Sequence, residues 1–192
     1  GTAARSLGDA PFILAGDSLG SYTSQAAAGA LPHDRLKGLV LGGASHEFIG
    51  APTLPYIAHA LLFRVMIALF GEDKLLARKM PTTLRTFGMS GEDADNTLAA
   101  GMSLKVFPQA VAALRGNDFR AMLARIEQPT MFINGDADTN HVRGEARYVA
   151  AARQATVHRF PDCEHGVSLR RSAQYATLLN AFARRVLLDE AA

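Results

Sequence analysis

The stretch from residue 11 to residue 20, P-F-I-L-A-G-D-S-L-G, constrains this chain more than any other. Residues 11–15 form a continuous apolar run, which is typical of a strand that is buried on both faces. The run leads directly into the turn G-D-S-L-G at residues 16–20, and an alanine-rich helical pattern follows. The sequence therefore predicts a strand, a sharp turn and a helix in direct succession.

A serine on such a turn has a special chemical setting. Its backbone is strained, and we expect the strand and helix to crowd it unless the residues two before and two after are small, as Gly16 and Gly20 are. The turn would place the Ser18 hydroxyl at the carboxyl edge of a sheet, with the Leu19 N–H beside it at a helix N-terminus. We therefore predict Ser18 as a nucleophile and Leu19 as an oxyanion donor, although the five-residue pattern by itself also arises in structural loops.

Further buried strands are predicted at residues 37–44 and 130–134, and an alternating strand nearer the sheet edge is predicted at 156–160. Helical patterns at about 21–30, 144–153 and 172–188 alternate with these strands. Two parallel strands joined by a helix form a right-handed unit, and strands that alternate with helices predict an α/β protein with a mostly parallel sheet. No internal repeat or low-complexity linker interrupts this pattern.

Residues 46–128 show helical patterns without a convincing strand. We interpret them as a helical cap inserted into a core of residues 1–45 and 129–192, and the alternative is an ordinary helical connection that fills out the core. Apolar side chains of the cap would include the lining of a substrate pocket; the candidates are Phe48, Ile57, Leu61, Phe63, Met66, Phe70, Phe87, Met89, Met102 and Phe107.

Composition narrows the classes of partner. The chain has 192 residues and a net charge of +2 without a basic run, so a nucleic-acid partner is not expected. The single cysteine, Cys163, excludes an internal disulfide and fits a reducing, cytoplasmic location, although one cysteine also fits a secreted bacterial enzyme. The N-terminal residues lack the layout of a signal peptide. The longest apolar run, residues 56–70, contains His59 and Arg64, so no membrane span is expected. We also expect no cofactor.

Two further residues complete a possible site with Ser18. An unassisted serine hydroxyl is a poor nucleophile, and it needs a base and a carboxylate that orients the base. Asp138 follows the third predicted strand and His165 follows the fourth. The carboxyl ends of parallel strands share one edge, so these side chains are expected near Ser18.

The order Ser, Asp, His resembles the α/β-hydrolase fold, and the likeness covers almost the whole chain. It rests on the turn at 16–20, the strand G-L-V-L at 38–41, the segment P-T-M-F-I-N-G-D-A-D at 129–138 and the final histidine turn. The resemblance implies helices on both faces of the sheet, Ser18 as nucleophile, His165 as base and then acid, and Asp138 as the orienting acid. It favours Asp138 over Asp136 because the family's acid stands three residues after the glycine that ends the strand.

The N-terminal part of the family's sequence pattern is absent. About four strands and the loop with the second oxyanion donor precede the strand that leads to the nucleophile in this fold, whereas about ten residues precede that strand here. We therefore expect this chain to be the C-terminal part of such a hydrolase, completed by an N-terminal segment or a partner chain. A functional monomer of this chain's mass would contradict that expectation. Asp17 and Ser21 also depart from common residues of the family, which affects the subfamily rather than the chemistry.

Two alternatives stay open. Residues 16–19 and the D-x-x-H block at 162–165 also resemble the GDSL-type lipases and esterases, in which Asp162 would replace Asp138. That family's G-x-N-D stretch is missing, and the carboxylate that contacts His165 distinguishes the two families. The second alternative is a non-catalytic ligand-binding protein, or an inactive fragment, on a hydrolase scaffold.

The minor candidates receive structural interpretations. His141, near Asp136 and Asp138, is interpreted as a solvated or hydrogen-bonded loop residue rather than a metal ligand, so no metal site is expected. Cys163 is interpreted as a small packing residue.

The expected reaction is hydrolysis of a small-to-medium apolar ester or lactone. Cleavage of a thioester, an amide or a carbon–carbon bond, and acyl transfer, would use the same residues.

Overall fold

A computed structural model describes residues 9–188. Its described part contains one four-stranded sheet in which all neighbouring strands are parallel, in the order β1-β2-β3-β4. The strands are β1 (Phe12–Asp17), β2 (Leu36–Gly42), β3 (Thr130–Gly135) and β4 (Ala155–Phe160). The predicted α/β class and parallel sheet are confirmed, and each strand lies within two residues of its predicted bounds.

Burial explains why these segments form strands. The residues of β3 are all buried, as are those of β2 except Lys37, which matches their continuous apolar sequences. The strands β1 and β4 lie at the two edges of the described sheet and are partly exposed. The apolar sequence of β1 therefore belongs to a strand whose outer edge is not paired by any strand among residues 9–188.

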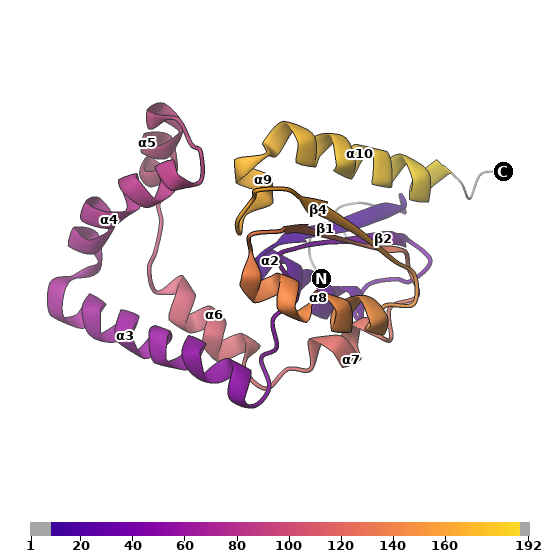
Figure 1. Cartoon of the computed structure of the whole chain (residues 1–192), viewed down its shortest axis with the longest axis horizontal. Coiled ribbons are helices and arrows are strands. Elements are labelled where there is room, and N and C mark those ends of the chain that lie inside the picture. The colour runs from indigo at the N-terminus through magenta and orange to yellow at the C-terminus, as the bar shows by residue number, and fades with distance from the viewer. Residues whose placement is uncertain (1–8, 189–192) are drawn as a thin grey trace. The chain divides into compact units, whose positions relative to one another are not determined.

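Helices cover both faces of the sheet (Figure 1). One face carries α2 (Leu19–Ala28), α7 (Phe119–Leu123) and α8 (Thr139–Ala151), and the other carries α10 (Ser172–Leu188) after the short α9 (Val167–Arg170). This arrangement confirms the predicted helices on both faces. It leaves the carboxyl ends of the strands, where Ser18 lies, uncovered by these helices.

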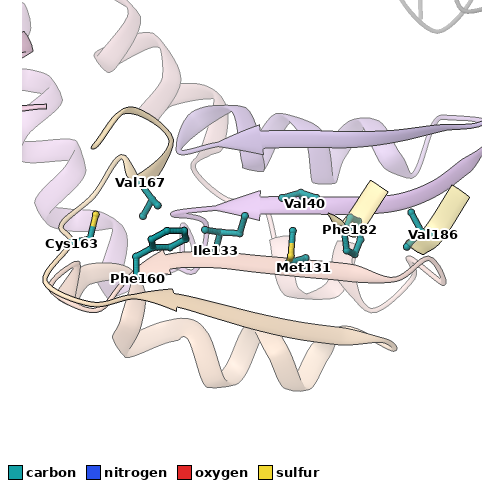
Figure 2. Close-up of a cluster of buried hydrophobic side chains, with 8 residues drawn as sticks. All are labelled: Val40, Met131, Ile133, Phe160, Cys163, Val167, Phe182 and Val186. Atoms are coloured by element: carbon teal, nitrogen blue, oxygen red, sulfur yellow. The ribbon is translucent and has the colours of Figure 1, made fainter. Parts of the chain in front are cut away.

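The core beneath α10 is a cluster of buried apolar side chains (Figure 2). A β-carbon on Gly38 would lie 2.8 Å from the Phe182 ring, so the absence of a side chain on β2 lets α10 pack closely. Cys163 is buried in this cluster, as a packing residue would be, and burial raises the pKa of its thiol. The cluster consists of Val40, Met131, Ile133, Phe160, Cys163, Val167, Phe182 and Val186.

The chain divides into two compact units. The sheet unit comprises the described residues up to Glu47 and from Asp118 onward, and the helical unit is Phe48–Asn117. The short helix α7 therefore packs with the sheet, whereas the sequence interpretation placed it in the insertion, which was predicted to end at residue 128. The two ends of the helical unit lie together, because the Gly116 N–H donates to the Phe48 carbonyl at 2.8 Å.

The helical unit contains η1 (Ala51–Thr53), α3 (Leu54–Phe70), α4 (Glu72–Thr86), α5 (Gly91–Ala99) and α6 (Val106–Leu114). Packing of α3 on α6 includes the Phe63 and Phe107 rings, whose centroids are 5.2 Å apart. Ser90 caps α5 by accepting a hydrogen bond from the Asp93 N–H at 3.0 Å. Helix α4 was not predicted.

Most of the apolar surface of α3 is exposed. Residues 51–70 are long and apolar enough to cross a membrane, and 11% of their most apolar window is buried. One such helix is a weak indication of a membrane span, because the core helix of a soluble protein meets the same criteria. The large exposed side chains on α3 are Leu54, Leu61, Leu62, Val65, Leu69 and Phe70.

Candidate active site

Ser18 lies on a sharp turn between β1 and α2. Its φ of 53° and ψ of −120° are strained values for a residue with a side chain. The Ser18 N–H donates to the Gly42 carbonyl at 2.7 Å, which fixes the turn against β2. Leu19 is the first residue of α2, and the N–H of a first helical residue has no partner within its helix. The turn therefore leaves this N–H beside the Ser18 hydroxyl.

The two glycines of the turn differ in their surroundings. A β-carbon on Gly16 would lie 2.3 Å from the Gly20 carbonyl oxygen, so Gly16 must lack a side chain. A β-carbon on Gly20 would meet no atom within 4 Å. The expected need for a small residue is therefore correct for Gly16 and wrong for Gly20 within the described residues.

Ser21 supports the turn in a way that the sequence interpretation missed. Its buried hydroxyl lies within hydrogen-bond distance of the carbonyl oxygens of Gly16, at 2.7 Å, and Gly42, at 2.8 Å. These acceptors belong to β1 and to the end of β2. The residue where relatives commonly have glycine thus connects the turn with both strands.

The loops after β3 and β4 hold Asp138 and His165, and these loops are bonded to each other. The Ala137 N–H donates to the Cys163 carbonyl at 3.0 Å, and the Asp136 N–H donates to the Phe160 carbonyl at 3.0 Å. A β-carbon on Gly135 would lie only 2.0 Å from the Cys163 carbonyl oxygen. This close approach needs glycine, and it sets the two loops in a fixed relation.

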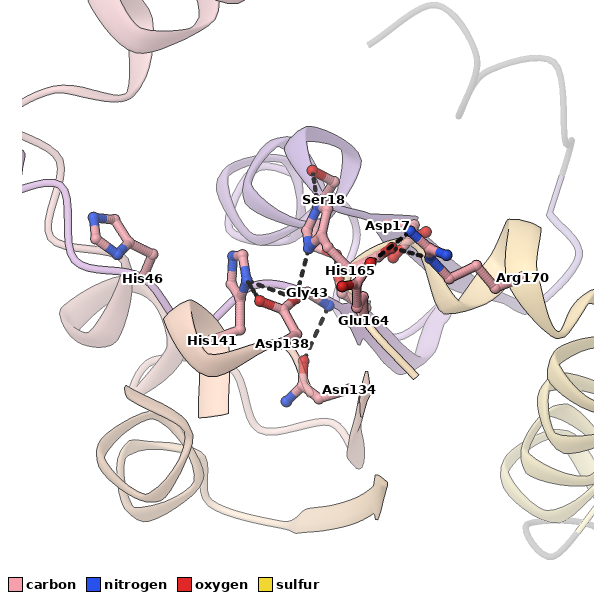
Figure 3. Close-up of polar contacts among 12 residues, drawn as sticks. Asp17, Ser18, Gly43, His46, Asn134, Asp138, His141, Glu164, His165 and Arg170 are labelled. Carbon is pink, nitrogen blue, oxygen red and sulfur yellow. Dashed lines mark hydrogen bonds and ion pairs between the residues drawn. The ribbon is translucent and has the colours of Figure 1, made fainter. Parts of the chain in front are cut away.

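The structure brings the three predicted side chains together (Figure 3). His165 Nε2 lies 2.8 Å from Ser18 Oγ, and His165 Nδ1 lies 2.7 Å from Asp138 Oδ2. The Asp138 side chain is 6% exposed and that of His165 is 35% exposed. A buried carboxylate therefore contacts one side of an imidazole whose other side faces a serine hydroxyl.

The electrostatics of this arrangement favour a charged carboxylate. Burial by itself would raise the pKa of Asp138, but hydrogen bonds from His141 and His165 outweigh it, so that pKa lies well below its usual range. The hydrogen bond to Asp138 raises the pKa of His165, burial opposes this, and the charges of Asp138 and Asp17 add to the increase. An imidazolium formed at His165 would therefore be stabilised.

The contact of His165 distinguishes the two predicted carboxylates. His165 contacts Asp138, whereas Asp162 occupies a turn with a φ of 50°. The GDSL-type alternative requires Asp162 at this contact, so the geometry contradicts it. Asp136 is exposed, which agrees with the choice of Asp138 over Asp136.

Gly43, just after β2, provides the surface on which His165 rests. Its φ is +56°, and a β-carbon there would lie 2.6 Å from His165 Cε1. The Gly43 N–H is shared between the Ile133 carbonyl and Asn134 Oδ1, both at 3.1 Å. The imidazole therefore packs against bare backbone that neighbouring β3 holds in place.

Asn134 belongs to a buried polar network that was not predicted. Its amide donates to Glu145 Oε2 at 2.5 Å, and Glu145 Oε1 accepts from Arg159 Nε at 2.8 Å. Glu145 lies on α8, and its residue is 2% exposed. The network connects β4, α8 and β3 with Gly43, and no pattern in the sequence marks it because its members lie in unrelated segments.

Asp17 connects the serine turn with the segment after His165. Its carboxylate accepts a short hydrogen bond from the Ser168 hydroxyl on α9. Arg170 holds the same segment from the other side, donating to the His165 carbonyl at 3.0 Å and to Glu164 at 2.9 Å. Both sides of the histidine turn are therefore fixed.

His141 is hydrogen-bonded, as one of the two sequence interpretations stated, but it is neither solvated nor in a loop, which corrects the rest of that prediction. Helix α8 begins at Thr139 rather than near residue 144, so His141 lies in its first turn and is 7% exposed. Ligand atoms of Asp138, His141 and His165 lie within 4.8 Å of one another, a grouping that a metal ion could use. In this structure both Nδ1 atoms are directed at the carboxylate as hydrogen-bond partners.

Solved structures share this architecture. MenH from S. aureus aligns with a TM-score of 0.73 at 16% identity, over 98% of this chain and 73% of that chain. The chain has the α/β-hydrolase fold. An esterase from Exiguobacterium antarcticum aligns with a TM-score of 0.71 at 17% identity, over 94% of this chain and 69% of that one. A thermophilic esterase from Thermogutta terrifontis aligns with a TM-score of 0.67 at 20% identity, over 96% of this chain and 69% of that chain.

The likeness lies in the fold rather than in the sequence. No protein-family model matches the chain, and no curated sequence matches it. The predicted resemblance to the α/β-hydrolase fold is confirmed.

Proposed function

We propose that this chain carries the active site of a serine hydrolase that cleaves an ester-like acyl bond. One observation carries the proposal: Ser18 Oγ, both nitrogens of His165 and a buried Asp138 carboxylate form a continuous hydrogen-bonded series. A serine, a base and an orienting acid in this order are what acyl transfer through a serine requires.

The reaction has two halves. Ser18 Oγ attacks the acyl carbonyl while His165 Nε2 takes the hydroxyl proton, and the Leu19 N–H stabilises the oxyanion. The tetrahedral intermediate expels the alcohol, which takes the proton from His165 and leaves an acyl group on Ser18. Water then attacks this ester with His165 again as base, and the acid is released. Asp138 fixes the imidazole tautomer and stabilises the imidazolium throughout.

A small-to-medium apolar ester or lactone is the proposed substrate. Two of the similar structures are described as esterases, and the helical unit exposes large apolar side chains on α3. Within the proposal, the helical unit is the cap of the enzyme. A serine nucleophile argues against the members of this fold that use a carboxylate nucleophile.

The second oxyanion donor and the neighbour of β1 are proposed to come from outside the described residues. The apolar β1 lies at an edge of the described sheet, and the chain aligns with 73% of MenH. Loss of a single oxyanion donor lowers kcat by about 10²–10³. An N-terminal segment or a partner chain would supply this donor and pair with β1.

A fluorophosphonate probe tests the proposal directly. We expect it to label Ser18 in the full-length protein and to block hydrolysis of chromogenic esters of graded chain length. Ser18→Ala should abolish both signals, and Asp138→Asn should lower kcat by about 10⁴, as loss of a triad carboxylate does. Asp162→Asn is the matched control and should leave activity nearly unchanged. An intact fold that the probe does not label would instead favour a non-catalytic ligand-binding protein.

A further inference from the structure

The Asp138 carboxylate has two imidazole partners. His165 Nδ1 lies 2.7 Å from Oδ2, while His141 Nδ1 lies 2.9 Å from Oδ2 and 3.0 Å from Oδ1. Asp138 stands at the N-cap of α8, but its side chain makes no capping hydrogen bond there. Oxygen Oδ1 therefore depends on His141, the only partner recorded for it among residues 9–188.

Helix geometry explains the position of His141. A residue three positions further along a helix lies above the first, so His141 in the first turn of α8 returns to the Asp138 side chain. Its side chain is 9% exposed. The ring stacks on that of His165, with centroids 4.8 Å apart and planes inclined by 20°. In Figure 3 both rings stand on the same side of Asp138.

We propose that His141 is a positioning residue of this site. It holds the Asp138 carboxylate in the orientation that His165 needs, and it weakens the electrostatic attraction between that carboxylate and a protonated His165. The inference rests on the proposed hydrolase function. His141 acts through Asp138, so its contribution is to geometry and charge rather than to bond making.

The hydrogen-bond roles follow from the chemistry of the groups. An ionised carboxylate only accepts, so each imidazole presents an Nδ1–H to Asp138. The Nδ1–H tautomer leaves His165 Nε2 with the lone pair that accepts the Ser18 hydroxyl proton. A second N–H on the carboxylate withdraws charge from it, which weakens the attraction for an imidazolium at His165.

These roles determine the direction in which loss of the His141 N–H shifts the pH dependence of activity. Asp17 is the other negative charge acting on His165, and Arg170 acts in the opposite direction. Neither is changed by a substitution at His141. Without the His141 N–H, Asp138 binds the imidazolium more strongly, so His165 must lose its proton at a higher pH before it can act as base.

Nuclear magnetic resonance of isotope-labelled histidine in the full-length protein tests the geometry without any activity. We expect neutral His141 and neutral His165 both to be Nδ1–H tautomers, each with a strongly deshielded Nδ1 proton. An Nε2–H tautomer for neutral His141 would overturn the proposal. This measurement stands even if Ser18 proves unreactive, so failure of the proposed function and failure of this inference can be told apart.

Variants at residue 141 then test the consequence. His141→Leu keeps the bulk but removes the donor, and His141→Asn places an amide N–H near the Nδ1 position. Since charge-assisted hydrogen bonds are strong, we expect His141→Leu to lower kcat by about ten- to a hundredfold with little change in KM. The acid limb of kcat/KM should move to higher pH by about half a unit or more. His141→Asn should restore most of both values.

The exposed His33 of the sheet unit is the control position, because His33→Leu should change neither kcat nor the pH profile. Equal losses in His141→Leu and His141→Asn without a shift of the acid limb would show that His141 only fills space, which overturns the proposal. An unchanged kcat and pH profile in His141→Leu would overturn it as well.

Discussion

Gly43 determines where the imidazole of His165 can lie. The ring rests against the backbone at a position where φ is +56° and where any β-carbon would lie 2.6 Å from Cε1. A conformation with positive φ favours glycine, and the close approach of the ring requires it. The position of His165 therefore depends on a residue that makes no hydrogen bond to it.

Gly43→Ala should abolish most activity. The methyl group must displace the ring, and even a displacement of about 1 Å can cost about 10² in rate. Gly50→Ala is a matched control: its φ is +69°, but a β-carbon there meets nothing within 4 Å. Ester hydrolysis and melting temperature would be measured for both. If both variants lose activity in proportion to their loss of stability, crowding of His165 is not the cause.

The pH profile should reflect the raised pKa of His165. The base must be neutral, so kcat/KM should fall as pH decreases through a value above the ordinary 6.5. Asp17→Asn removes a negative charge that contributes to the increase, and its acid limb should lie at lower pH. A limb at or below the ordinary value in the unsubstituted protein would contradict the geometry. Stability from protonated His165 is present below the ordinary pKa and is lost as pH rises through the raised one.

At the residue scale, sequence reasoning identified the side chains whose types and order are unusual. Ser18, Asp138 and His165 each follow a strand, and parallel strands bring such positions to one edge. It misread His141 because the polar residues after Asp138 were interpreted as a loop, and moving the helix start to Thr139 changes what His141 can contact. The role of Asn134 was not predicted because its hydrogen-bond partners come from distant segments of the sequence.

At the level of elements, helix α8 joins the site to the sheet. Its Glu145 is buried and contacts Asn134 on β3 and Arg159 on β4, while its first turn carries His141. A buried carboxylate with charged and amide partners is costly to remove, because those partners lose their acceptor. The helix therefore supports β3, β4 and the base at once.

Glu145→Ala should lower the free energy of unfolding by about 2 kcal/mol, because Asn134 is left with a buried amide that lacks its acceptor. Glu164→Ala is the control. The Glu164 side chain is 70% exposed and forms an ion pair with Arg170, and exposed ion pairs contribute about 0–1 kcal/mol. Chemical denaturation would measure both variants. Equal effects would mean that the network around Glu145 contributes no more than a surface pair.

The elements that the sequence predicted well are those with a strong apolar pattern. Strands β1, β2 and β3 each contain a continuous apolar run, β4 alternates apolar and polar residues, and α10 shows one apolar face. Helix α4 has a polar sequence with Pro81 inside it, and proline normally ends a helical pattern. Its turns are supported by neighbours such as α3 and α5, which a local pattern cannot indicate.

At the scale of the whole molecule, the role of the helical unit in substrate binding stays a prediction. Leu61 and Leu69 on α3 are 62% and 70% exposed. If this unit binds the acyl chain, Leu61→Gln and Leu69→Gln should raise KM for long-chain esters by about tenfold, as loss of buried apolar area does, and leave short-chain esters nearly unaffected. Leu188→Gln on α10, 63% exposed, is the control. An equal change for all chain lengths would contradict an acyl-binding role.

The hydrogen bond between Gly116 and Phe48 has a consequence for engineering. Because the two ends of the helical unit lie side by side, the sheet unit needs only a short bridge to remain continuous. The helical unit can therefore be replaced as a whole. Chimaeras that graft other helical inserts between residues 47 and 118 should keep the relative positions of Ser18, Asp138 and His165 while their substrate selectivity changes.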